Sequence, residues 1–355
     1  MSKKILIIDF NGTTPVYTYY FAKNLKSKDS IVDILGYKNK EELKYFDEKL
    51  NYIEINLKNK GINYFCYWIY LFFLTRKYDA LVIEWLPFLK YSSFEIILIK
   101  ILKKLNKNLF YTVHNFFPHN NSDKKIENRY LNLYQNLPNL LVHSFETKKK
   151  LEKYKIKNRI IKINHGALFS DINFTEKKDL KMIGMFGTIS EYKGIEDAIK
   201  MLSLLADKSY YLYIAGKGKE NYIEKLKKLV AEYNLENKVI IDNKYLSVEE
   251  IIKLTKKSSI TLMPYKNIEQ SGVALTSIGL GTPIVGYSIG GLKDLVITGY
   301  NGILVESGQY LELSKGVEKV VENYDYFQKN NTEQLNKISW VKNLEIILNE
   351  IERKK

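Results

Sequence analysis

Short apolar runs alternate with longer segments of helical periodicity along most of the chain. Unbroken apolar runs of strand length are typical of parallel strands that are buried on both faces. Strands are predicted at residues 5–9, 80–83, 110–113, 140–144, 160–163, 182–187, 210–215, 239–241, 260–263 and 284–287. Most connections between them are long enough to hold a crossover helix, so the pattern predicts an α/β protein with parallel sheets.

The alternation is interrupted once, by the polar and charged residues 170–181, and restarts at Met182. The chain of 355 residues is also longer than a single hydrophobic core usually supports. We therefore predict two domains, with a boundary between residues 172 and 178.

Two apolar segments of the first half need separate interpretation. Residues 62–74 are almost wholly apolar or aromatic but too short to span a bilayer, so we expect a buried helix in which Cys66 is an inert buried thiol. A single cysteine excludes a disulfide framework and a cysteine-based zinc site. Residues 88–107 have helical periodicity and five lysines, which fits either a helix with a solvated lysine face or a basic amphipathic helix on a membrane.

The net charge of +15 is unevenly distributed. Residues 1–175 carry 29 Lys and Arg against 16 Asp and Glu, whereas residues 176–355 carry 26 against 24. This asymmetry favours an anionic partner for the first half, either membrane lipid or nucleic acid, unless it only reflects a lysine-rich composition. The apolar run after Lys3 and Lys4 has the length of a strand and not of a signal peptide, so we expect a cytoplasmic location.

Residues 264–302 contain the clearest candidate for binding chemistry. Ser271 is a candidate N-cap for a helix that follows the strand at 260–263, and Gly290 and Gly291 precede a second short helix after the strand at 284–287. Helix N-termini present unpaired N–H groups and a partial positive charge, which suits a phosphate. Glu269 and Gln270, directly before the first helix, could bind sugar or ribose hydroxyls.

An ordered set of short motifs resembles the retaining family 4 glycosyltransferases of the GT-B class. In the second half it comprises Gly187, Lys193-Gly194, Gly216-x-Gly218, Gln270-Ser271-Gly272-Val273, Gly281-x-Pro283, Gly290-Gly291-Leu292 and Asn301-Gly302. In the first half it comprises the TVHN and PH segments around His114 and His119, the VHS segment at His143, and His165-Gly166. Each motif alone is weak evidence, whereas the ordered set is specific. The sequence matches the subgroup of the family that has a Gln-Ser-Gly-Val segment.

The resemblance implies a GT-B architecture, in which two Rossmann-like domains with parallel sheets face an interdomain cleft. Residues 1–172 would bind the acceptor and residues 178–336 the nucleotide sugar. A C-terminal helix, here residues 337–355 with Ser339-Trp340 at its start, would return to the first domain.

The resemblance also implies site residues. His114, Lys193 and Glu269 would be catalytic. The donor nucleotide sugar would meet Gly12, Gly187, Thr188, Lys193, Gly216, Lys217, Tyr245, Leu246, Gln270, Ser271, Gly272, Val273 and Thr276. The acceptor side would hold Asn11, Thr13, Asn115 and His165.

Two departures from the family pattern affect this site. Thr188 stands where many members carry an Arg, and Lys217 could replace the lost charge. Ile268 and Thr276 stand where many members carry two glutamates, of which the second binds ribose, and Glu269 and Gln270 could replace the first.

The implied activity is transfer of a hexose-type sugar from a UDP- or GDP-sugar to a glycan or polyprenyl-diphosphate-linked acceptor, with retention. No metal is expected, because the sequence has no Asp-x-Asp segment. A peripheral position on the anionic inner face of the cell membrane and a role in cell-surface polysaccharide or glycolipid synthesis would follow. Two alternatives remain open, namely a sugar-nucleotide epimerase of the same fold and a non-catalytic, basic nucleic-acid-binding protein.

Overall fold

A computed structural model describes residues 2–10, 12–26, 30–44, 46, 50–54, 62–118, 123–163, 165–173 and 175–352. The chain forms two compact units, one made of Met1–His165 with Ser339–Lys355 and the other of Gly166–Ile338. The chain passes from the first unit to the second at residue 166, six residues before the expected boundary of 172 to 178. It returns to the first unit at residue 339, two residues after the expected 337. Each unit is described by itself below.

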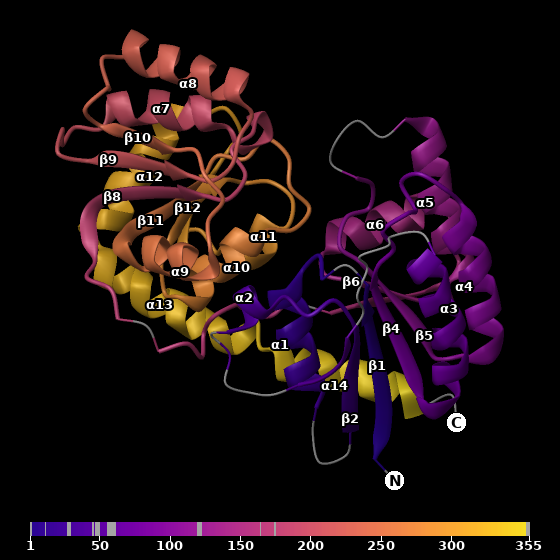
Figure 1. The fold of residues 1–355 in the computed structure, drawn as a ribbon. Helices are drawn as coiled ribbons and strands as arrows, with labels where there is room; N and C mark the ends of the chain where they lie inside the picture. The colour runs from indigo at the N-terminus through magenta and orange to yellow at the C-terminus, as the bar shows by residue number, and fades with distance from the viewer. Residues whose placement is uncertain are drawn as a thin grey trace. The chain divides into compact units, whose positions relative to one another are not determined.

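The first unit is built on a seven-stranded sheet in the order β3-β2-β1-β4-β5-β6-β7, with all strands parallel (Figure 1). Its strands are β1 (Lys3–Asp9), β2 (Ser30–Gly36), β3 (Asn51–Glu54), β4 (Ala80–Trp85), β5 (Leu109–Val113), β6 (Asn139–Val142) and β7 (Arg159–Lys162). Its helices are α1 (Pro15–Leu25), α2 (Lys40–Leu43), α3 (Ile62–Leu74), η1 (Thr75–Lys77), α4 (Phe94–Leu105), α5 (Lys124–Asn136), α6 (Phe145–Lys153) and α14 (Trp340–Glu352). The alternation of strand and helix confirms the predicted fold class for this unit.

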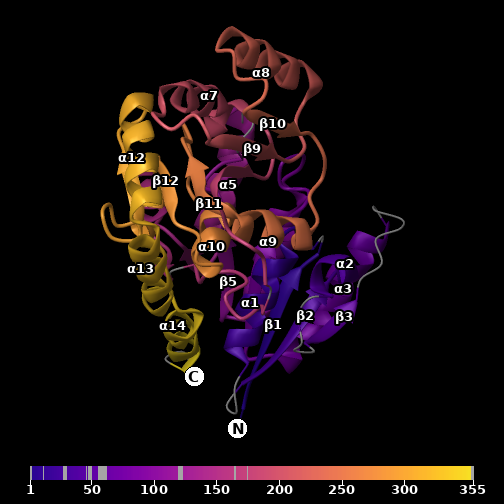
Figure 2. The same ribbon diagram turned by 90° about the vertical axis from the view of Figure 1, so that its left-hand side faces the viewer.

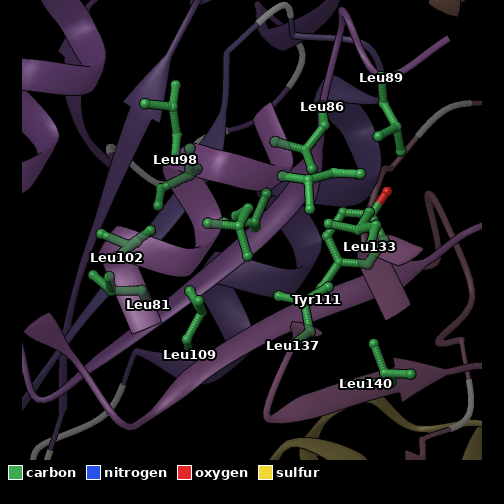
Figure 3. Packing of buried hydrophobic residues seen from close by; sticks show 14 of the residues in the cluster. Leu81, Leu86, Leu89, Leu98, Leu102, Leu109, Tyr111, Leu133, Leu137 and Leu140 are labelled. Carbon is green, nitrogen blue, oxygen red and sulfur yellow. The ribbon is translucent and has the colours of Figure 1, made fainter. Parts of the chain in front are cut away.

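The core of the first unit lies between the sheet and the helices that follow β3 to β5. Figure 3 shows Leu98 and Leu102 of α4 among side chains of the sheet, including Leu81 of β4 and Leu109 of β5. All four are at most 6% exposed. Leucines four apart lie on one side of a helix, which is why α4 turns this side to the sheet.

The C-terminal helix α14 packs against α1 of the same unit (Figure 1). The Trp340 ring stacks on Tyr20 at 6.3 Å between centroids, and Lys3 donates a hydrogen bond to the Leu348 carbonyl at 3.0 Å. The C-terminal helix therefore returns to the first unit, as predicted.

The second unit is built on a six-stranded parallel sheet in the order β10-β9-β8-β11-β12-β13. Its strands are β8 (Asp179–Phe186), β9 (Tyr211–Ala215), β10 (Val239–Asp242), β11 (Ser258–Met263), β12 (Ile284–Tyr287) and β13 (Gly302–Val305). Its helices are η2 (Glu191–Lys193), α7 (Ile195–Leu204), α8 (Glu220–Glu232), α9 (Val248–Lys257), α10 (Gly272–Gly279), α11 (Leu292–Leu295), α12 (Tyr310–Glu322) and α13 (Tyr324–Lys337).

Both faces of the second sheet are covered by helices (Figure 2). Ile183 and Met185 of β8 join the core with α7, α8 and α12, whereas Met182 and Phe186 point to the other face, where α9 packs. This alternation along one strand is the period of two that β-geometry imposes. Both faces of such a strand are buried, which is why its apolar run is unbroken in the sequence.

One prediction about the first unit is wrong. Cys66 is exposed and not buried, because α3 buries only one side. On its other side Phe65, Ile69, Tyr70 and Phe73 are exposed as well. The all-apolar sequence of α3 gave no signal for which side would pack. Within the described residues, no helix combines the length and apolar character needed to cross a membrane.

Candidate active site

In the second unit, two glycines bring together the loops that follow β8 and β9. Gly187 and Gly216 both have positive φ, at 89° and 148°. A Cβ on Gly216 would lie only 1.9 Å from the carbonyl oxygen of Gly187, so the close approach requires glycine there. Because the strands are parallel, their carboxyl ends share one edge of the sheet, where binding groups of open α/β sheets gather.

Lys193 reaches this edge from η2. Its ammonium nitrogen donates a hydrogen bond to the Phe186 carbonyl at 2.6 Å and lies 5.3 Å from the centroid of the Tyr265 ring. The side chain is only 5% exposed, and burial lowers the pKa of Lys193 to about 7. Gly194, which follows it with φ of 65°, has no room for a Cβ, because the Pro264 carbonyl oxygen would be 1.9 Å away.

The start of α10 lies beside the same glycine. Ser271 caps α10, since its hydroxyl accepts a hydrogen bond from the Ala274 N–H at 3.1 Å, as predicted. A Cβ placed on Gly187 would lie 3.0 Å from Lys193 Nζ and 3.6 Å from a methyl carbon of Val273. The Lys193 ammonium group and the N-terminus of α10 therefore both lie beside Gly187. Among the described residues, no heavy atom from outside the helix and the adjoining residues lies within 4 Å of the position of a Cβ on Gly272, so this first turn has free space beside it.

One buried polar atom in this region, Gln270 Nε2, has no hydrogen-bond partner among the described residues. Buried polar atoms are normally paired, so this amide nitrogen is a candidate donor to a ligand or a water molecule. Glu269, next to Gln270, is buried, and its carbonyl oxygen would be 2.4 Å from a Cβ on Gly291. The loops after β11 and β12 are therefore in contact.

The other residues of the second unit that were predicted to bind the donor lie in the loops after β8, β9 and β10 and in α10. Thr188 and Lys217 are exposed, and Lys217 accepts a hydrogen bond at its carbonyl from the N–H of Ile189, at 3.0 Å. Tyr245 is 84% exposed in the loop after β10, where Leu246 is half-buried against the core on the α9 face. Thr276 is buried in α10, one turn beyond its first residues.

In the first unit, the turn after β1 is fixed by Asp9. Its carboxylate accepts hydrogen bonds from the Thr13 N–H at 3.2 Å and the Thr18 hydroxyl at 3.0 Å, and burial raises the pKa of Asp9. Gly12 has φ of 55°, and a Cβ there would lie 2.8 Å from the Tyr37 carbonyl oxygen. Asn11 and His119 lie outside the described residues.

His114 follows β5 and is paired with Glu84 of the neighbouring strand β4. Its Nε2 lies 2.9 Å from Glu84 Oε2, and its ring stacks on Trp85 at 4.8 Å between centroids. Glu84 is fully buried, and its other oxygen has no partner among the described residues. A carboxylate only accepts, so Nε2 donates and His114 keeps Nδ1 for another contact.

His143 is held by its two ring nitrogens. Nε2 lies 3.0 Å from the Tyr17 hydroxyl, and Nδ1 lies 3.3 Å from the Ile163 carbonyl oxygen, to which it donates. Burial lowers the pKa of His143 well below its ordinary value, so the ring is neutral and structural.

The Tyr17 ring connects the three histidines of this edge, with centroids 4.8 Å from those of His114 and His165. His165 also contacts Trp340 of the C-terminal helix, at 5.2 Å. Asn115 is half-buried, and its carbonyl accepts a hydrogen bond from the Tyr134 hydroxyl at 3.3 Å. The structure therefore brings His114, His143 and His165 together around one aromatic ring.

Sequence reasoning missed several residues of both groups, namely Tyr17, Glu84, Trp85, Tyr265 and Trp340. Glu84 and Trp85 carried a signal, because a polar residue that ends an apolar strand lies at the edge where sites form. Tyr17 carried none, since it is one of several tyrosines in an apolar helix. No group of His, Cys, Asp or Glu in the described residues is arranged to hold a metal ion.

Comparison with known proteins gives a family match for the second unit. Residues 169–337, just under half of the chain, match the model of the family Glycosyl transferases group 1. The second unit is therefore similar to that family. The matched residues cover the unit almost from end to end, and they include Gly187, Lys193 and the start of α10.

Curated relatives match over part of the chain. An uncharacterized glycosyltransferase of Methanocaldococcus jannaschii is 28% identical over 200 residues, which are 53% of this chain and 52% of the relative. The capsular polysaccharide biosynthesis glycosyltransferase CapM of Staphylococcus aureus is 25% identical over 175 residues, which are 48% of this chain and 43% of CapM. The chain thus spans about half the length of these relatives.

Among solved structures, HepE of Anabaena in complex with UDP and glucose has a TM-score of 0.71 and 16% identity, and covers 99% of each chain. At this identity the likeness concerns the fold alone. The chain therefore has the two Rossmann-like units with parallel sheets that a GT-B fold requires, as predicted.

Proposed function

We propose that the protein is a retaining glycosyltransferase that moves a hexose-type sugar from a UDP- or GDP-sugar to a glycan or lipid-linked acceptor. The observation that carries the proposal is the position of Lys193 Nζ beside Gly187 and the first turn of α10. Transfer leaves a nucleoside diphosphate, whose new negative charge needs preorganised positive groups. A buried lysine and the N–H groups of Gly272 and Val273 would supply them without a metal ion.

The proposal assigns the other residues accordingly. Gln270 would donate a hydrogen bond to the nucleotide sugar, because its buried amide nitrogen is unpaired among the described residues. Glu269 would contact the transferred sugar. In the first unit, Thr13, Asn115 and His165 would face the acceptor, and His114 would orient sugar or acceptor hydroxyls. The leaving phosphate itself would take the acceptor's proton, with attack on the same face and retention.

The relatives support this choice by their names. CapM acts in capsular polysaccharide biosynthesis, and HepE was captured with UDP and glucose. A cell-surface polysaccharide or glycolipid product fits both, and a polyprenyl-linked acceptor would place the protein at the inner face of the cell membrane. Neither the epimerase nor the nucleic-acid-binding alternative is favoured by these comparisons.

A thermal-shift panel tests the proposal on the intact chain with UDP, GDP, ADP, their glucose conjugates and a DNA duplex. A ligand that binds only the native state raises the unfolding temperature, so UDP or GDP should do so and DNA should not. The Lys193→Met variant keeps most of the apolar volume and removes the buried charge, and it should lose the nucleotide shift. Lys228→Met on α8 is the matched control. An equal nucleotide shift in Lys193→Met would place the anion site elsewhere.

A further inference from the structure

Two neighbouring helices of the first unit leave apolar side chains exposed. On α3 these are Phe65, Ile69, Tyr70 and Phe73, and on α4 they are Ile97, Ile101 and Leu105. We call these seven residues the α3–α4 face. Phe73 and Ile97 are 71% and 61% exposed. Spacing of three or four residues places the members of each helix on one side of it. The two helices are in contact, and the Tyr64 and Phe94 rings meet at 6.3 Å.

The core does not require this face. The inner sides of the same helices already fill it, through Trp68 and Leu71 of α3. Leu98 and Leu102 of α4 do the same (Figure 3). No charged residue occurs anywhere in α3, although such helices of soluble proteins carry a polar outer side. Exposed apolar side chains that gather on two helices in contact with each other indicate a surface that binds something.

The exposed charge along this segment of the chain is of one sign. Residues 62–107 contain seven basic residues, and every one is exposed, namely Arg76, Lys77, Lys90, Lys100, Lys103, Lys104 and Lys107. Of the three acidic residues in that range, Glu84 and Glu95 are fully buried, and the third, Asp79, is half-buried. None of the seven forms an ion pair within the described part of the chain.

We propose that the α3–α4 face docks on an anionic lipid bilayer. The aromatic and aliphatic side chains enter the boundary between headgroups and acyl chains, while the long lysine side chains extend to the lipid phosphates. A second copy of the chain fits the surface less well. In a two-fold dimer the same patch meets itself, so the lysine rims would meet as like charges. The inference rests on this surface and does not depend on the donor chemistry proposed above.

Vesicle flotation of the intact chain tests the docking. We expect binding to vesicles of phosphatidylglycerol and phosphatidylcholine, weaker binding at 0.5 M salt, and little binding to phosphatidylcholine alone. The variant Lys100→Gln/Lys103→Gln/Lys104→Gln should lower partitioning about 100-fold, since each lysine near an anionic surface contributes roughly a factor of five. Phe73→Ser/Ile97→Ser should lower it at least tenfold, by the loss of apolar burial.

Matched variants on the second unit control for general effects of charge and hydrophobicity. Lys225→Gln/Lys227→Gln/Lys228→Gln removes three exposed lysines of α8, and Leu311→Ser/Tyr326→Ser removes two side chains that are 51% and 53% exposed. Both should float like the wild type. Unfolding temperatures and UDP binding should be unchanged in all four variants, which separates a failure of docking from a failure of the donor site.

Three outcomes overturn the proposal. Equal binding to both vesicle types would show that anionic lipid does not contribute to docking, which contradicts the proposal. Equal losses in the α8 variant would show a dependence on net charge alone. Absence of flotation overturns it whatever the oligomeric state. If light scattering then shows a dimer that Phe73→Ser/Ile97→Ser turns into a monomer, a second copy covers the face.

Discussion

Nε2 of His114 lies 2.9 Å from a carboxylate oxygen of Glu84. Glu84 lies in β4, and His114 directly follows the neighbouring strand β5. Because the carboxylate accepts a hydrogen bond, it fixes the proton of His114 on Nε2 and leaves Nδ1 as an acceptor until the ring is protonated. Glu84 thereby acts as a positioning residue for a candidate catalytic histidine.

This pairing predicts two different losses of activity. His114→Ala should lower sugar transfer by about 10² or more, the usual scale for a group that handles or polarises a proton. Glu84→Gln should lower kcat about tenfold and change the shape of its pH profile, because the amide can donate to Nε2 and move the ring proton to Nδ1. Glu84→Asp keeps the charge and should restore the wild-type profile. An unchanged pH profile in Glu84→Gln would leave Glu84 with a packing role only.

The pKa of Lys193 predicts proton uptake on nucleotide binding. Burial lowers it to about 7, so at pH 8 most of the free protein carries a neutral amine there. A bound diphosphate favours the ammonium, so a proton is taken up, and UDP affinity should fall about tenfold per pH unit above 7. Calorimetry at pH 8 in phosphate and in Tris should give binding enthalpies that differ by the ionisation enthalpies of the buffers. Lys193→Met should abolish that difference. Equal enthalpies for the wild type would mean that Lys193 does not meet the phosphate.

Lys217 is predicted to replace the charge that Thr188 lacks. The N–H of Ile189 donates to the carbonyl of Lys217, so the lysine stands next to the position of the missing arginine. Lys217→Ala should weaken UDP binding about fivefold to tenfold, the scale of one partly screened, charge-assisted contact. Lys219→Ala, an exposed lysine two residues on, should have little effect. Adding Thr188→Arg to Lys217→Ala should recover affinity; no recovery would argue against the substitution.

Much of this donor group could be predicted from the sequence, because its parts are local. Apolar runs marked the strands, Ser271 marked a helix start, and parallel strands bring the loops after them to one edge of the sheet. The contact of Gly187 with Lys193 and Val273 follows from that topology. The chemical roles of these residues stay predictions.

The histidine group was less accessible for the opposite reason. The partner of His114 is thirty residues away along the chain, and strand pairing alone brings Glu84 beside it. Tyr17 reaches His143 across 126 residues, which no periodicity encodes. The exposed side of α3 was not predicted either, because a helix that is apolar nearly all round does not specify which side packs. The burial of Cys66 was wrongly predicted for the same reason. The edge strand β3 and its neighbour β2 were not predicted, because polar residues interrupt their apolar runs.

Glu95 predicts how the stability of the first unit depends on pH. The side chain is buried in α4 and accepts a hydrogen bond from the Tyr64 hydroxyl, and burial raises the pKa of Glu95 to about 7. Between the ordinary pKa of about 4.5 and this value, the folded chain holds a proton that the unfolded chain has lost. The stabilising contribution is therefore complete below pH 4.5 and is lost as pH rises through 7, by about 3 kcal/mol at most.

Unfolding temperatures of the wild type and of Glu95→Gln at pH 5, 6.5 and 8 measure this contribution. The difference between the two proteins should shift in favour of the variant as pH rises. Glu152→Gln on α6, whose carboxylate is solvated, should stay parallel to the wild type. Parallel curves for Glu95→Gln as well would show that Glu95 is ionised throughout this range.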